Sequence, residues 1–134
     1  MKNLGELLAK SWLDKTLLNL DSLEKKDIPS TRKEAFEAQN IFYQSINKKT
    51  VGWKIGAVAK EVQEEEGYDG PVPGKIFEDT FLQINTNIDF NDIPHSNLEC
   101  EYALKFLKDS KIDNDLEKNV NQIKLFTAID ITST

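Results

Sequence analysis

The segment LECEYALKF, residues 98–106, decides how we expect this chain to fold and where we expect its site. Its apolar side chains, with Cys100 among them, occupy every second position, which is the period of a β-strand with one buried face. Glu99 and Glu101 then share the opposite face. Because residues two apart on a helix do not face each other, the two carboxylates converge only on a strand. The pattern therefore predicts a strand that turns Cys100 toward a core and two acids toward one place.

Two neighbouring carboxylates have two interpretations. They bind a hard cation such as Mg²⁺, which takes oxygen ligands from one or two carboxylates and keeps other positions for water and substrate. Alternatively, they form the solvent face of an ordinary strand. A third acid, Asp130, lies in the apolar segment LFTAIDI, residues 125–131, which predicts a buried strand. Because burying an unpaired carboxylate is costly, we expect Asp130 to be the third ligand.

The N-terminal part of the chain has helical periodicity. Leucines and Trp12 recur at spacings of three and four over residues 4–20, which predicts an amphipathic helix. Thr31 and Glu34 have the spacing of a capping box, so a second helix is predicted over residues 31–46. We expect both helices to be scaffold.

Residues 51–57, VGWKIGA, alternate and predict a strand that places Lys54 between Gly52 and Gly56 on one face. A lysine between two residues without side chains stands in a bare patch that a ligand can approach. Partial desolvation would suit Lys54 to proton transfer. The alternative is a strand lysine whose amine simply reaches water.

The remaining segments are less regular. We predict a short helix over 60–66, a loop over 67–74, a strand over 75–84 and a helix over 112–124. The single histidine, His95, is interpreted as a surface residue rather than a ligand.

Composition limits the possible partners. The net charge of -6 argues against nucleic acid and anionic membrane surfaces, which would repel the chain. The single cysteine cannot form an intrachain disulfide, which fits a reducing cytoplasm. No apolar run approaches the length of a membrane span. We therefore expect a cytoplasmic protein that binds a small molecule or a metal ion.

Four stretches, in this order, resemble the 2-keto-4-pentenoate hydratases of the fumarylacetoacetate hydrolase superfamily: GWKIG at 52–56, PVPGKIF at 71–77, LECE at 98–101 and AIDI at 128–131. The resemblance covers residues 4–131. It implies an α+β chain in which a helical N-terminal segment is followed by a mixed β-sheet. A helical domain with the first strand would occupy residues 1–70, and the first part of a metal-binding, β-rich domain would occupy residues 71–134.

The resemblance also implies an activity. Such enzymes are lyases that hydrate a small 2-hydroxydienoate, a form of a 2-keto acid, in the breakdown of aromatic compounds, and they use Mg²⁺ or Mn²⁺. The residues that the resemblance assigns are Glu99, Glu101 and Asp130 to the metal, Lys54 to proton transfer, and Pro73, Gly74 and Phe77 to the substrate.

Two alternatives stay open at this point. The related 4-oxalocrotonate decarboxylases share the metal and the lysine, so these residues do not separate the two activities. Chains of the family are also longer, so the resemblance covers their N-terminal half. We therefore expect this chain by itself to be inactive or nearly so as a hydratase, and to associate as a homo-oligomer or with a complementing second half. A non-catalytic remnant or subunit is the third interpretation.

Overall fold

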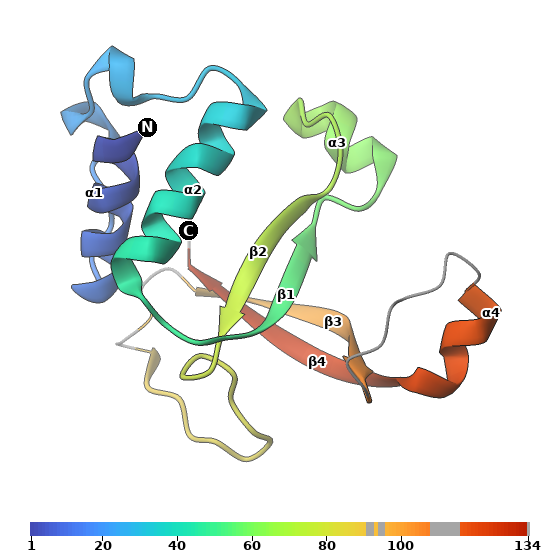
Figure 1. The fold of residues 1–134 in the computed structure, drawn as a ribbon. Coiled ribbons are helices and arrows are strands. Elements are labelled where there is room, and N and C mark those ends of the chain that lie inside the picture. Colours follow the sequence, from blue (N-terminus) through green and yellow to red (C-terminus); the bar gives the residue numbers. More distant parts are fainter. Residues whose placement is uncertain (91–92, 94–95, 108–115, 134) are drawn as a thin grey trace. The chain divides into compact units, whose positions relative to one another are not determined.

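The computed structural model describes residues 1–90, 93, 96–107 and 116–133. Helices come first and small antiparallel sheets follow, which confirms the predicted α+β class (Figure 1). The chain divides into two compact units, Met1–Asn87 and Ile88–Thr134. This division lies later than the predicted one after residue 70, because the next strand pairs within the first unit. The expectation of a mixed sheet is wrong for the described strands. They form two separate two-stranded antiparallel sheets.

The first unit begins with two α-helices that pack on each other. A Cβ atom at Gly5 would lie 2.6 Å from the carbonyl oxygen of Ala38, so the close approach of the helices requires glycine there. The predicted helix over 4–20 ends early, at Leu13, and Lys15 then takes a left-handed conformation with φ 53°. Among the described residues, no helix combines the length and the apolar character needed to cross a membrane. The helical elements are α1 (Lys2–Leu13), η1 (Leu20–Ser22), η2 (Lys25–Asp27) and α2 (Arg32–Ile46).

A capping box starts α2, as predicted. The Thr31 hydroxyl accepts a hydrogen bond from the Glu34 backbone N–H at 3.2 Å. In return the Glu34 carboxylate accepts from the backbone N–H groups of Ser30, at 2.8 Å, and Thr31, at 3.1 Å. These hydrogen bonds hold the pKa of Glu34 below its usual value, and the bond from the Ser30 backbone N–H contributes most.

The lowered pKa of Glu34 predicts an acid-sensitive helix start. The stabilisation is present above the ordinary carboxyl pKa of 4.5 and is lost as the pH falls through the lowered value. Urea unfolding should therefore show Glu34→Gln to be less stable than the wild type at pH 7, with the difference shrinking toward pH 2. Glu37→Gln, one turn along the same helix and outside the capping box, is the control for the loss of a carboxylate from α2.

The core of the first unit lies between the helices and the end of a strand. Ala9, Ile46 and Phe77 are buried, and Trp12 and Tyr43 pack against them. The Phe77 ring lies edge-on to both, with centroid distances of 5.8 Å to Trp12 and 5.9 Å to Tyr43. Phe77 thereby anchors its strand to α1 and α2.

That strand belongs to the first sheet, in which β1 (Thr50–Gly56) pairs antiparallel with β2 (Val72–Phe77). β1 and the short helix α3 (Lys60–Glu66) lie where they were predicted. The strand predicted over 75–84 is displaced, because pairing with β1 begins at Val72 and the chain turns after Phe77. The predicted loop over 67–74 consequently ends at Pro71.

The second unit is a long hairpin of β3 (Ser96–Phe106) and β4 (Ile123–Ser133). α4 (Leu116–Asn119) and η4 (Val120–Gln122) lead into β4, so the helix predicted over 112–124 is shorter in its described part and gives way to strand at Ile123. Part of that prediction, and the prediction for His95, lie outside the described residues.

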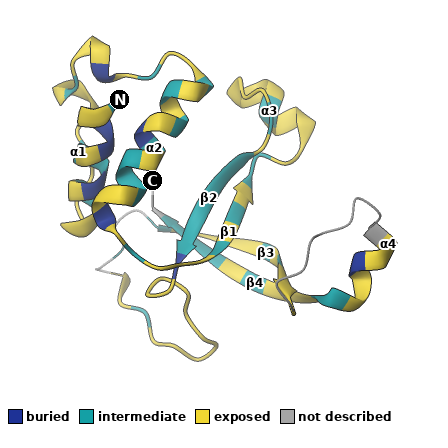
Figure 2. Cartoon of the chain, viewed as in Figure 1, coloured by how far each residue is buried: buried dark blue, intermediate teal, exposed yellow. Residues whose placement is uncertain are grey.

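One face of this hairpin is apolar, and we call it the apolar face. The predicted alternation is confirmed, but the predicted burial is wrong: Cys100 is exposed, and Leu98, Tyr102 and Ile129 keep 62%, 79% and 69% of their surface. In Figure 2 much of β3 has the colour of exposed residues. A period of two fixes which side chains share a face, and a second layer decides whether that face is buried. The apolar face consists of Leu98, Cys100, Tyr102, Leu104 and Phe106 on β3 and Ile123, Leu125, Thr127, Ile129 and Ile131 on β4.

Candidate functional site

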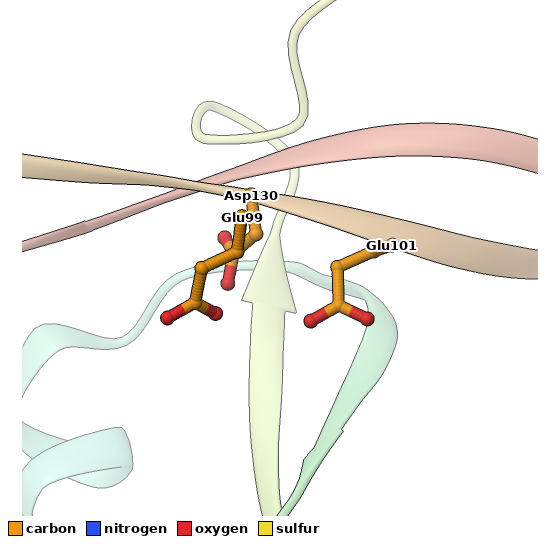
Figure 3. Close-up of side chains that lie close together, drawn as sticks. All are labelled: Glu99, Glu101 and Asp130. Carbon is orange, nitrogen blue, oxygen red and sulfur yellow. The ribbon is translucent and has the colours of Figure 1, made fainter.

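The opposite face of the β3–β4 hairpin gathers three carboxylates (Figure 3). Glu99 and Glu101 stand two residues apart on β3, and Asp130 on β4 is paired directly with Glu99. Directly opposed residues of an antiparallel pair project to the same face, so all three side chains point to one side. One ligand atom from each lies within 4.8 Å of the others. The predicted convergence of the three acids is therefore confirmed.

The spacing suits a small divalent cation. Mg²⁺ holds oxygen ligands at about 2.0–2.1 Å, so two of its ligands lie at most about 4.2 Å apart. The three oxygen atoms are within 4.8 Å of one another, and small side-chain rotations would bring them to that separation. Glu101 and Asp130 are half-buried and Glu99 is exposed, which leaves room for water or a ligand on the open side. Glu99, Glu101 and Asp130 could thus hold a metal ion.

The simpler interpretation is an acidic strand face, since exposed acidic groups are common without a metal ion. That interpretation accounts for two glutamates on one strand. It does not account for the third carboxylate, which comes from another strand and faces Glu99 directly.

Lys54 lies on β1 in the first unit, and the side chains of Val72 and Ile76 project to the same face of the sheet. Gly52 and Gly56 flank it along the strand, as predicted, and the register sets Gly74 of β2 directly opposite. Three of its nearest positions on the face therefore carry no side chain. Lys54 is half-buried in this patch.

Neither backbone conformation nor packing explains these three glycines. None of them has the positive φ that favours glycine, in contrast to Gly67 and Gly70. A Cβ atom would meet its nearest neighbour at 3.7 Å at Gly52 and Gly56, and at 4.0 Å at Gly74, which is ordinary contact. Glycine inside a strand is destabilising relative to alanine by roughly 0.5–1 kcal/mol. The three glycines leave the positions next to Lys54 without side chains.

The residues predicted to border a substrate have different surroundings. Gly74 faces Lys54 across the sheet, and Pro73 pairs with Ile55. Both are half-buried. Phe77 is only 5% exposed and packs into the core of its unit. Its ring therefore anchors the end of β2 rather than facing a substrate.

Side chains of helix α2 form hydrogen bonds with the backbone of β2 and of the loop before it, which the sequence did not reveal. Both N-terminal helices were expected to be scaffold, yet Arg32, Gln39 and Tyr43 of α2 each bond the backbone around β2. Their spacings of seven and four place them on one helix face, which is the only signal the sequence carries. Burial raises the pKa of Tyr43 above its usual value.

No family model and no curated protein matches this chain.

Proposed function

We propose that this chain is a hydratase-like protein, related to the 2-keto-4-pentenoate hydratases, that binds Mg²⁺ or Mn²⁺ through Glu99, Glu101 and Asp130. Its substrate would be a small 2-hydroxydienoate or 2-keto acid. The observation that carries the proposal is the convergence of three carboxylates from two paired strands on one face. Oxygen-rich sets of this kind suit hard divalent cations.

The residues of the chain have separate tasks in this proposal. When bound, a divalent ion supplies a Lewis acid for the carboxylate and 2-oxo oxygens of such a substrate. By the resemblance, the Lys54 amine would exchange protons with the substrate while water adds to its distal double bond. Pro73 and Gly74 would border the substrate by the same resemblance, and Gly74 is paired with Lys54 across the sheet.

An assay of 2-hydroxypenta-2,4-dienoate hydration with Mg²⁺ or Mn²⁺ tests the reaction through the loss of dienoate absorbance. Any turnover should disappear in Lys54→Ala and in Glu99→Ala, and persist in Lys60→Ala, which removes an exposed lysine of α3. Turnover that survives either of the first two substitutions would contradict the assigned roles. Decarboxylation of 4-oxalocrotonate under the same conditions would favour the decarboxylase alternative.

Replacing a glycine next to Lys54 should increase the stability of the chain and weaken ligand binding. Gly56→Ala should raise the free energy of unfolding by about 0.5–1 kcal/mol, because neither φ nor packing requires glycine there. The same substitution should weaken the binding of 2-oxopentanoate, followed by NMR shifts of the Lys54 and Gly74 amides, because a methyl group would enter the bare patch. Gly67→Ala is the control and should be destabilising, since Gly67 has φ 72°. Unchanged 2-oxopentanoate binding in Gly56→Ala would argue against a ligand site at Lys54.

A further inference from the structure

The first turn of α2 holds the loop that leads into β2. The Arg32 guanidinium donates to the carbonyl oxygens of Gly70, at 3.1 Å, and Pro71, and it bonds the Asp69 carboxylate at 2.9 Å. It also lies over the Phe36 ring, 5.0 Å from the centroid. A guanidinium with several fixed acceptors holds a backbone more firmly than a single contact can.

Two further side chains of α2 hold β2 itself. Gln39 donates from Nε2 to the carbonyl oxygen of Pro73 at 3.0 Å, and the Lys75 backbone N–H donates to the Tyr43 hydroxyl at 3.0 Å. These backbone groups belong to the edge of β2 that β1 does not pair, since β2 has one strand neighbour in the part of the chain that the structure describes. An open strand edge presents a row of polar backbone groups. Side chains of α2 bond them here in place of a third strand.

We infer that Arg32, Gln39 and Tyr43 are positioning residues, which hold the backbone of β2 so that Gly74 stays opposite Lys54. This inference rests on the proposed function of Lys54. Gly74 lies between the two residues whose backbones are bonded to Gln39 and Tyr43, and it is itself paired with Lys54. A displacement of about 1 Å at a reacting group can cost about a hundredfold in rate, so a fixed β2 matters to the amine opposite it.

The hydroxyl of Tyr43 can be separated from the structural role of its ring. The ring packs against Phe42 and Phe77 in the core, whereas the hydroxyl bonds only β2 among the hydrogen bonds described. Tyr43→Phe therefore keeps the packing and removes the contact. Gln39→Met likewise keeps the length of the side chain and removes its donor.

Hydrogen exchange on the full chain tests the inference without any turnover. In the double variant Gln39→Met/Tyr43→Phe, the amides of Gly74 and Lys75 should exchange about tenfold faster, while core amides of α1 and α2 keep their rates. Tyr68→Phe removes an exposed hydroxyl and is the control. Uniformly faster exchange across the unit would show a merely structural role and overturn the inference, as would unchanged exchange at Gly74. If the double variant does not fold, Arg32→Lys takes its place, because lysine keeps the positive charge but lacks the several donors of the guanidinium. Hydrogen exchange is then measured at the amides of Gly70 and Val72, and the same criteria apply.

Turnover and metal binding separate this inference from the proposed function. If the wild type hydrates the dienoate, the double variant should lower kcat about tenfold and leave KM within about twofold, because the amine is misplaced rather than removed. Its Mn²⁺ affinity should be unchanged, because Glu99, Glu101 and Asp130 keep their pairing. Failure of the proposed function would appear as absent Mn²⁺ binding in the wild type, whereas failure of the inference would appear as wild-type exchange at Gly74 in the variant.

Discussion

Glu101→Gln should weaken Mn²⁺ binding to this chain by at least about tenfold, which is a loss of about 1.4 kcal/mol in binding free energy. Glutamine keeps the length of the side chain and its place on β3, so the change is confined to one negative charge. Two carboxylates, Glu99 and Asp130, would remain on the face. Titration calorimetry, or the electron paramagnetic resonance signal of free Mn²⁺, measures the change directly.

The same variant should also gain less stability from the metal. With Mn²⁺ in excess the melting temperature of the wild type should rise more than that of Glu101→Gln, because the wild type binds the ion more tightly. Glu117→Gln removes the same charge from α4 in the same unit and should leave both the affinity and the metal-dependent gain unchanged. Equal Mn²⁺ affinity in Glu101→Gln and the wild type would rule out this metal site.

Local patterns were sufficient to predict that Glu99 and Glu101 share one face of a strand. The alternation around Glu99 and Glu101 required a strand, and a strand required the two carboxylates to share a face. The capping box at Thr31 could also be predicted from the sequence, because all its groups lie within one helical turn. The position of Asp130 opposite Glu99 is a matter of register, which depends on the pairing of distant segments. The sequence indicated that Asp130 needed a partner but not which residue it would face.

The sequence failed where a distant partner decides the outcome. Cys100 was assigned to a core because it alternates with acids, yet alternation does not supply the layer that would cover it. The strand predicted over 75–84 begins at Val72 because β1 provides the pairing there. The contacts between α2 and β2 were missed for the same reason, since they join Gln39 and Tyr43 to a segment that is distant in the sequence.

The apolar face of the β3–β4 hairpin should make the chain associate with a second copy of itself. Leu98, Tyr102 and Ile129 lie on this one face and remain largely exposed. A contiguous apolar patch of this kind marks an interaction surface, unlike single exposed apolar residues. A stable interface buries about 800 Å² on each partner, and a two-stranded sheet can approach that area by stacking its face on another. Light scattering and sedimentation should therefore detect dimers or larger assemblies.

Ile129→Glu should weaken this association by at least about a hundredfold, because a charge buried without a partner costs several kcal/mol. Lys105→Gln changes the net charge by the same amount on the opposite face, so it is the control and should leave the assembly intact. Cys100 is paired with Ile129 and supplies a second readout. Its alkylation by a bulky maleimide should be slow in the wild-type assembly and fast in Ile129→Glu. A wild type that stays monomeric at high concentration, with Cys100 alkylated as fast as in the variant, would contradict association through this face.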